Sequence, residues 1–286
     1  MLKITDITNL AQIFDYQMRL QSPCFFTANF ESWKESFEND IDGEGRVLFQ
    51  KLHGKAAYDG DSLIGFIQYG NTAFGFDDSG EISMDVSYPV IRSLYFDEGR
   101  EDAGKLLLQE AMEEFESADK VYAFFHYFGM TCFARHGKLH EKHAHIAQVL
   151  NGVGFQIEHE NVYYSFLLKG AETSAVQIKA HSLTRGNQQY LDFILSEEQV
   201  GGCEVHFLDA RNAYLRWIYV NENMTGKGIG TKCMTALKQW LYQKGIARFD
   251  TDTALSNHIA QHYYEKNGFS CEGITRSYLY VTNVKG

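Results

Sequence analysis

Proline is almost absent from this sequence, with two residues in 286, and long apolar runs are missing as well. The scarcity of proline argues against a rigid proline-rich linker. No stretch reaches the roughly 18 apolar residues that a membrane-spanning helix needs. The first ten residues lack the basic start and apolar run of a secretory signal. We therefore expect a cytoplasmic protein with no membrane partner.

Cysteine pairs and positive charge are also scarce. The five cysteines are an odd number, are widely spaced and include no Cys-x-x-Cys pair, so neither a disulfide framework nor a zinc site is indicated. The chain has 26 Lys and Arg against 37 Asp and Glu, a formal net charge of −11. A nucleic-acid surface needs clustered basic residues, so we predict no nucleic-acid partner. From the cysteine spacing we also predict no bound metal. An acidic chain is compatible with a cationic amine as its partner.

What the sequence does contain is an internal repeat. The segment IRSLYFDEGREDAGKLLL from Ile91 aligns with LRWIYVNENMTGKGIGTK from Leu215. Residues 153–155 later align with residues 267–269 at an offset ten residues smaller, so the first copy carries an insertion. The repeat predicts two domains, 1–170 and 171–286, which meet in the polar stretch LKGAETS. The positions that match in the first alignment are Arg92 and Arg216, Tyr95 and Tyr219, Glu98 and Glu222, and Gly104 and Gly228.

Hydrophobic periodicity predicts the same order of elements in each copy. For the second copy we expect an antiparallel meander with turns between its strands, a helix, a strand, a second helix and a final strand. The first copy follows this order after two additional helices. The fold class is therefore α+β, a mixed and mostly antiparallel sheet flanked by helices. The expected segments are 190–195, 203–208, 213–220, 230–245, 247–253, 257–266 and 277–281, and in the first copy 6–20, 29–39, 47–68, 90–96, 104–116, 120–127 and a helix ending near 150.

A glycine-rich turn, VNENMTGKGIGTK, separates the strand that ends at Val220 from the helix that begins near Gly228. Converging backbone N–H groups at a helix N-terminus favour an anion such as a phosphate, and glycines let that anion approach the amides. A tight turn without a ligand is the alternative. The spacing differs from the GxxxxGK[ST] phosphate loop and from the GxGxxG dinucleotide motif.

This turn resembles the pyrophosphate loop of the GNAT (GCN5-related N-acetyltransferase) superfamily. Thr225 stands where the family has Arg or Gln, and Gly228 and Gly230 stand at the family's small-residue positions. A second segment, NHIAQHYYEKNGF, resembles the family's following helix at Asn257, Ala260, Tyr264, Gly268 and Phe269. The resemblance implies two tandem GNAT-like domains, of which the first is degenerate.

The resemblance also implies a cofactor site for acetyl-CoA. The amides of residues 226–231 would hold the pyrophosphate, the strand before the turn would pair with pantetheine, and Asn257 would touch the pantetheine arm. Tyr264 would protonate the departing thiolate. The alternative is that Tyr264 is only a buried core residue, since the adjacent Tyr263 could be the tyrosine that points inward. The implied cofactor-binding residues are Ile218, Tyr219, Val220, Thr225, Gly226, Lys227, Gly228, Ile229, Gly230, Thr231 and Asn257.

An amine acceptor must lose a proton before it attacks, so a base or a water relay is expected. We nominate Glu222, and weigh Asp250, Asp252, Glu204 and Asp209 beside it. For each of these carboxylates a solvated surface group is the competing interpretation.

The first copy departs from the pattern where chemistry is needed. Asp102 and Leu106 replace Gly226 and Gly230, and His143 and Leu150 replace Asn257 and Tyr264. We predict that this copy has lost cofactor binding and catalysis. Four histidines close by, His136, His140, His143 and His145, are interpreted as a solvated helix rim, with a metal site as the alternative.

Together these features predict an N-acetyltransferase that moves acetyl from acetyl-CoA to a primary amine, of a small molecule or a peptide, by direct attack. A non-catalytic acyl-CoA-binding regulatory module is the alternative. We expect a monomer or a homodimer.

Overall fold

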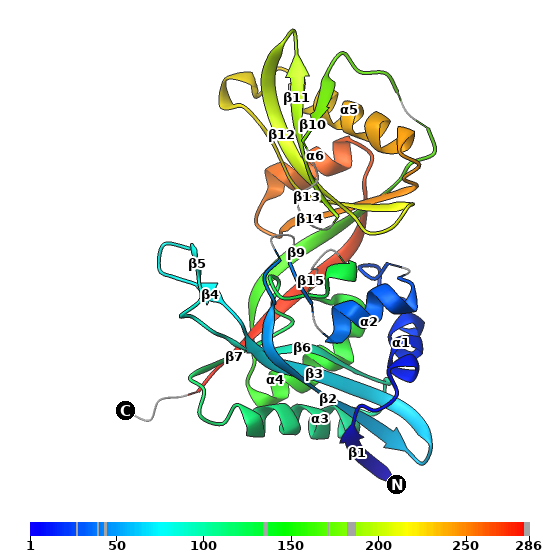
Figure 1. Cartoon of the computed structure of the whole chain (residues 1–286), viewed down its shortest axis with the longest axis vertical. Coiled ribbons are helices and arrows are strands. Elements are labelled where there is room, and N and C mark those ends of the chain that lie inside the picture. The colour runs from blue at the N-terminus through cyan, green and yellow to red at the C-terminus, as the bar shows by residue number, and fades with distance from the viewer. Residues whose placement is uncertain are drawn as a thin grey trace. The chain divides into compact units, whose positions relative to one another are not determined.

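The computed structural model describes residues 1–26, 28–38, 40–42, 45–133, 137–170, 172–181 and 187–282. The chain forms two compact units (Figure 1). Unit 1 comprises Met1–Asp42, Arg46–Glu160 and Thr275–Gly286, and unit 2 comprises Gly43–Gly45 and Asn161–Ile274. Within the described ranges no helix is long and apolar enough to cross a membrane.

Unit 1 is a sheet with helices on both faces. Its strand order is β1-β2-β3-β6-β7-β15. Phe66 of β3 contacts Tyr16 of α1 on one face, whereas Tyr69 of the same strand contacts Phe115 at the end of α3 on the other. The elements up to β9 are β1 (Leu2–Asp6), α1 (Leu10–Arg19), α2 (Phe30–Glu38), β2 (Phe49–Asp59), β3 (Ser62–Thr72), β4 (Gly75–Phe76), β5 (Ile82–Ser83), β6 (Pro89–Phe96), α3 (Glu101–Glu114), β7 (Lys120–Ala123), η1 (Thr131–Phe133), β8 (Leu139–His140), η2 (Glu141–His143), α4 (Ala144–Val153) and β9 (Gln156–Leu167).

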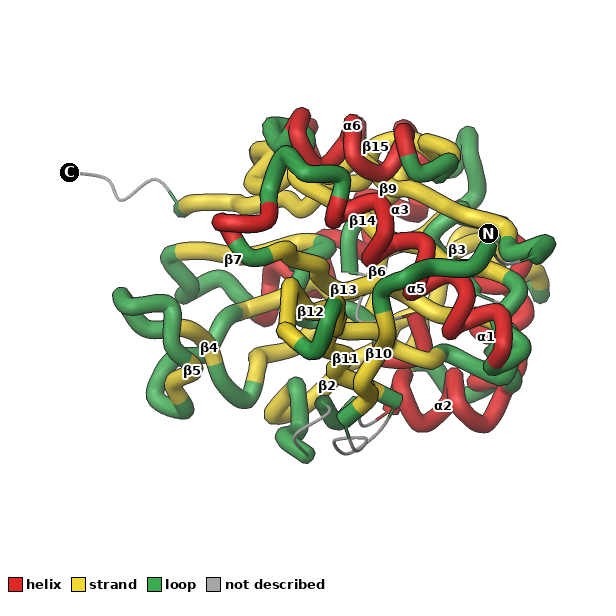
Figure 2. The backbone as a smooth tube through the Cα atoms, turned by 90° about the horizontal axis from the view of Figure 1, so that it is seen from above, coloured by secondary structure: helices red, strands yellow, loops and turns green. Residues whose placement is uncertain are grey.

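Unit 2 has the strand order β9-β14-β13-β12-β11-β10, and Figure 2 shows β11, β12 and β13 side by side. One face packs against α5 and α6 through a core that includes Leu191, Val205, Leu215 and Phe249. Because side chains alternate along a strand, Tyr190 and Glu204 belong to the opposite face. The elements are β10 (Gln177–Ala180), β11 (Gln188–Leu195), β12 (Glu198–Phe207), β13 (Asn212–Val220), η3 (Glu222–Met224), α5 (Ile229–Gln243), β14 (Arg248–Ala254), α6 (His258–Lys266) and β15 (Ser270–Val281).

Among the strand pairs whose register the structure describes, β6–β7 in unit 1 and β13–β14 in unit 2 are parallel, and both are short. In unit 2, β13 pairs with β14 only from Asn212 and Arg248 to Leu215 and Thr251. Beyond this point β13 continues to Val220 and β14 to Ala254 without pairing with each other. The two strands therefore form a fork that opens after Leu215 and Thr251.

The predicted α+β class and the predicted helices are confirmed. One predicted turn, over residues 196–202, is wrong in extent. Ser196 and Glu197 alone make the turn, both with positive φ of 51° and 69°. Two such residues form the tight hairpin connection that matches strand twist, so β12 begins at Glu198.

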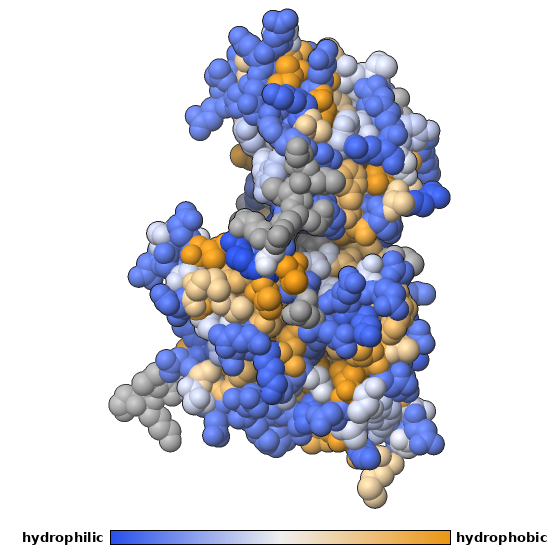
Figure 3. Space-filling model, viewed as in Figure 1, coloured by the Kyte–Doolittle hydropathy of each residue, from blue (hydrophilic) through white to orange (hydrophobic). Residues whose placement is uncertain are grey.

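The units exchange their last strands. Residues 161–167 of β9 pair with β14 inside unit 2, and residues 278–281 of β15 pair with β7 inside unit 1. The division at residue 170 describes the sequence copies and stays a prediction. Hydrophilic residues cover much of the visible face of each unit (Figure 3).

Candidate active site

The glycine turn follows β13 directly. Gly226 and Gly228 both have φ of +74°, a left-handed conformation that favours glycine over residues with a Cβ. No atom lies within 4 Å of where a Cβ would stand at either glycine. The space above both backbones is therefore open, as an anion site requires.

The amide N–H groups of residues 226–231 have no hydrogen-bond acceptor among the described residues. The first helical hydrogen bond of α5 runs from Lys232 N to Gly228 O, 3.4 Å. Unpaired N–H groups at a helix N-terminus carry positive partial charge. The turn can therefore hold a phosphate through its backbone.

Thr225 and Lys227 help to shape the turn. The Thr225 amide and hydroxyl both donate to the Glu222 carbonyl, at 3.2 and 2.8 Å. The Lys227 ammonium donates to the Asn223 carbonyl at 2.9 Å. Position 225 thus closes the turn with its amide, and Lys227 adds a cation beside it.

The strand before the turn offers backbone groups toward the fork. Asn221 N donates to Val200 O at 2.9 Å, and Tyr219 stands opposite Gly202 on β12. Because antiparallel pairs alternate between bonded and non-bonded positions, the backbone groups of Ile218 and Val220 point away from β12. They face the edge of β13 along which β14 is no longer paired.

Tyr264 lies at the origin of this fork. Its buried ring packs against Tyr164 and Phe269, at 5.6 and 5.5 Å. Burial raises the pKa of the Tyr264 hydroxyl, and a side-chain hydrogen bond with Thr251 opposes that rise. Thr251 donates to Leu215 O at 3.0 Å, across the last paired position of β13 and β14. No motif marks Thr251 in the sequence.

The neighbouring Tyr263 serves a different purpose. Its hydroxyl donates to Gly230 O at 2.8 Å, and burial raises its pKa well above the usual value. Tyr263 thus holds the first turn of α5, and Tyr264 is the tyrosine at the fork.

Asn257 is the N-cap of α6. Its Oδ1 accepts from Ala260 N at 3.1 Å, as N-cap residues commonly do. The oxygen is therefore used within the helix, and the side-chain NH2 group is the part that faces other partners.

Two of the carboxylates considered as bases are buried. Asp250 is fully buried, with Arg248 Nε at 3.0 Å and the Tyr163 hydroxyl at 2.9 Å; burial raises its pKa against the opposing effect of Arg248. Glu204 is buried and accepts from His206. The interpretation of these two residues as solvated surface groups is wrong, because each has polar partners that offset its desolvation.

The other three lie nearer to solvent. Asp252 accepts hydrogen bonds from Tyr214 and Asn161, and Asp209 accepts from the amides of its own turn. Glu222 is exposed in η3, and its carboxylate has no partner among the described residues.

The equivalent region of the first copy is occupied by the protein itself. Arg100 bonds both Asp102, at 3.1 Å, and Asp59, at 2.9 Å, at the start of α3. A Cβ on Gly104 would meet the Phe96 ring at 2.3 Å, so this glycine allows close packing. His145 Nε2 lies 2.9 Å from Phe96 O. Phe96 is the strand residue of the first copy that aligns with Val220.

The histidine cluster is not a solvated rim. His140 and His143 are only 5% and 4% exposed, and His136 lies outside the described residues. Burial, with help from neighbouring charges, lowers the pKa of His143 to about 4. The described part of the chain holds no group of three His, Cys, Asp or Glu side chains arranged for a metal.

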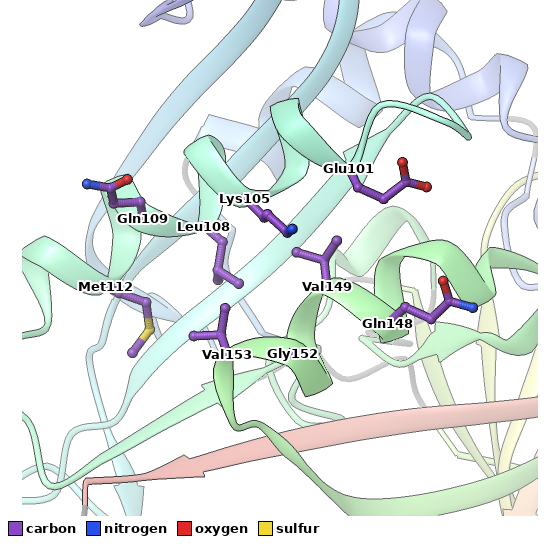
Figure 4. Close-up of a pocket in the computed structure, with 9 residues that line it drawn as sticks. All are labelled: Glu101, Lys105, Leu108, Gln109, Met112, Gln148, Val149, Gly152 and Val153. Carbon is purple, nitrogen blue, oxygen red and sulfur yellow. The ribbon is translucent and has the colours of Figure 1, made fainter.

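Two hollows contain none of the predicted cofactor-binding residues, although Asp209 lines the second. One, of about 630 Å³, lies between α3 and α4 in unit 1, where Lys105, Leu108, Val149 and Val153 line it (Figure 4). The other, of about 400 Å³, is lined by residues such as Phe207, Lys244 and Ile246. The fork is the better candidate for the active site, because its free strand edge and the unpaired amides beside it can bind an extended, anionic ligand.

Residues 158–269 match the model of the Acetyltransferase (GNAT) family. None of the curated proteins compared with the chain matches its sequence.

Three solved structures are similar to the chain, each at 11% identity. A tandem GNAT protein from the clavulanic acid biosynthesis pathway covers 98% of both chains with a TM-score of 0.64. A GCN5-related N-acetyltransferase from Sphaerobacter thermophilus covers 98% of this chain and 95% of its own, with a TM-score of 0.62. A GNAT acetyltransferase from Colwellia psychrerythraea covers 98% and 100%, with a TM-score of 0.53. At this identity the likeness concerns the fold.

The predicted resemblance to the GNAT superfamily, of the tandem type, is thereby confirmed. The fold of this family points to acyl transfer from acyl-CoA. Residues 158–269 match the GNAT family, and the chain has the fold of tandem GNAT proteins.

Proposed function

We propose that the chain transfers acetyl from acetyl-CoA to a primary amine by direct attack, at the fork of unit 2. The observation that carries this proposal is the set of unpaired amides at residues 226–231, directly after a strand whose edge is free. A diphosphate fits the amides, and an extended pantetheine arm fits the edge.

The chain's residues have separate tasks in this proposal. The amides of residues 226–231, with the Lys227 ammonium, bind the pyrophosphate. The backbone of Ile218 and Val220 pairs with the pantetheine amides, and the side-chain NH2 of Asn257 contacts the same arm. The bound cofactor supplies an activated acetyl thioester.

Tyr264 is the proposed proton donor to the departing thiolate. Burial keeps its pKa above the usual value, so the hydroxyl stays protonated at neutral pH. A thiol has a pKa near 8.5, lower than that of a phenol near 10, so the donation depends on positioning. Thr251, whose hydroxyl donates to Leu215 O at 3.0 Å, contributes to the environment of the Tyr264 hydroxyl.

The acceptor amine must be neutral when it attacks. Deprotonating an alkylamine with a pKa near 10.4 at pH 7 costs about 4.6 kcal/mol. We propose that Glu222 accepts this proton through water, since it is the carboxylate of the five whose side chain has no partner among the described residues.

Tyr264→Phe tests the proposal. We expect kcat for thiol release to fall roughly 10²–10⁴-fold, the range of a positioned proton donor, while calorimetry shows CoA affinity within about twofold of the parent. Tyr242→Phe is the matched control, because Tyr242 is an exposed tyrosine of α5. Unchanged kcat in Tyr264→Phe would refute its role. CoA binding without turnover on any amine would instead support a non-catalytic acyl-CoA-binding regulatory module.

A further inference from the structure

Three exposed aromatic rings form a row on the face of unit 2 that lies opposite α5 and α6. Tyr190, Trp217 and Tyr219 are 37%, 39% and 46% exposed. Their ring centroids are 6.0 Å apart from Tyr190 to Trp217 and 5.8 Å from Trp217 to Tyr219. The interplanar angles of 38° and 36° make the row a shallow, nearly continuous shelf. We call these three residues the aromatic row.

Buried polar groups fix the middle ring. The Trp217 indole N–H donates to Glu204 at 2.7 Å, and Glu204 accepts from His206 at 2.6 Å. Both Glu204 and His206 are buried. Burial tends to raise the pKa of Glu204, but the hydrogen bonds from His206 and Trp217 lower it on balance, so the carboxylate is ionised at neutral pH. A desolvated charge is costly, and here it orients an exposed ring.

The end ring is also held. Gln199 Nε2 bonds the Tyr219 hydroxyl at 3.4 Å and Asp192 at 3.0 Å, and Asp192 also pairs with His181 at 2.7 Å. A second carboxylate thus lies beside the row, while Arg216 is the nearby cation. One carboxylate, Glu204, thus bonds the row directly, and a second, Asp192, is linked to it through Gln199.

The row adjoins the fork. Trp217 and Tyr219 alternate along β13 with Ile218 and Val220, whose side chains pack toward α5. Tyr264 reaches the fork from the α5 and α6 face. A group lying on the aromatic row therefore approaches the same strand edge from the other face.

Ring faces attract cations and stack on flat rings. A carboxylate that accepts the indole N–H increases electron density in the Trp217 ring, which strengthens both effects. We propose that the aromatic row binds the acceptor, and that this acceptor is an arylalkylamine, a primary ammonium carried on a flat ring. This inference rests on the proposed acetyl transfer for its reaction, but the binding surface is independent of it.

The test compares phenethylamine with the straight-chain amine hexylamine in the thiol-release assay, using the full chain. We expect kcat/KM for phenethylamine to be at least roughly tenfold higher. Trp217→Phe and Trp217→Leu both lose the indole N–H, so the difference between them reports the ring. We expect Trp217→Leu to raise KM for phenethylamine roughly tenfold above that of Trp217→Phe, with CoA affinity unchanged in both.

Binding without CoA separates this inference from the proposed function. Phenethylamine should change the fluorescence of Trp217, and Trp217→Phe should remove that change while Trp33 and Trp240 remain as internal references. Equal kcat/KM for phenethylamine and hexylamine, or equal KM for phenethylamine in the two Trp217 variants, would refute acceptor binding by the aromatic row. Either result would leave acetyl transfer unchallenged. Saturable Trp217-dependent binding without turnover on any amine would support the row and refute acetyl transfer.

Discussion

Single residues decide whether the glycine turn can bind an anion. Gly228 has a left-handed backbone and open space above it, so conformation and bulk can be tested separately at one position. His143 is a second decisive residue, because its burial makes the stability of unit 1 depend on pH.

Gly228→Asn and Gly228→Val separate these two effects. Asn tolerates the left-handed conformation, so its cost is mainly the side chain placed above the amides, whereas Val adds backbone strain of about 1–2 kcal/mol. We expect both to weaken CoA binding at least roughly tenfold, Val more than Asn, as measured by calorimetry. Gly152→Ala is the control, since Gly152 lies in α4 with open space around it. Parental affinity in Gly228→Val would contradict the anion site.

His143 predicts a loss of stability in mild acid. Burial lowers its pKa from the usual value near 6.5 to about 4 in the folded chain, so the unfolded chain binds more protons as pH falls below 6.5. Stability should then decrease by about 2 kcal/mol between pH 7.5 and pH 5 through this residue alone. Urea unfolding at both values measures the change, and His143→Leu should flatten it. An equal pH dependence in His143→Leu would show that other groups cause it.

For helices and strands, the sequence predicted the position of individual helices, but not which side chains from different strands contact each other. Apolar spacing located α5 because Cys233, Leu237 and Leu241 share one face, and the motif from Asn257 to Phe269 located α6. The hairpin turn at Ser196 and Glu197 was predicted too long because these two residues adopt positive φ without glycine. Burial of Glu204 and Asp250 was missed as well, because it depends on partners from other strands.

The N-cap of α6 offers a prediction at this scale. Asn257→Ala removes the cap and should destabilise the chain by about 1 kcal/mol, whereas Asn257→Asp keeps an acceptor for Ala260 N. If the Asn257 NH2 contacts the cofactor, both variants should weaken CoA binding, although only Asn257→Ala lowers the unfolding midpoint. Parental CoA affinity in Asn257→Asp would leave Asn257 with a capping role alone.

For the whole molecule, the repeat was visible in the sequence, but the fate of the first copy needed the structure. Asp102 and Leu106 predicted the loss of a phosphate site. The contact of His145 with Phe96 O could not be predicted from the sequence. The insertion in the first copy makes it impossible to align the residue that reaches this strand.

This asymmetry predicts one CoA molecule per chain. Calorimetric titration should give a stoichiometry near one, and Gly228→Val should abolish the only transition seen. A second binding event that survives Gly228→Val would show that the first copy retains a site of its own. Arg100→Ala then serves as the diagnostic variant, since Arg100 is the basic side chain at the start of α3.

The exchanged strands have a consequence during synthesis. β7 emerges from the ribosome early, but the segment that pairs with it, residues 278–281, emerges only after all of unit 2. Until then one edge of the nascent sheet in unit 1 has no neighbour, and open edges invite association with other chains. The N-terminal portion should therefore depend on chaperones until β15 has emerged, and nascent chains stalled before residue 275 should be sensitive to protease in β7.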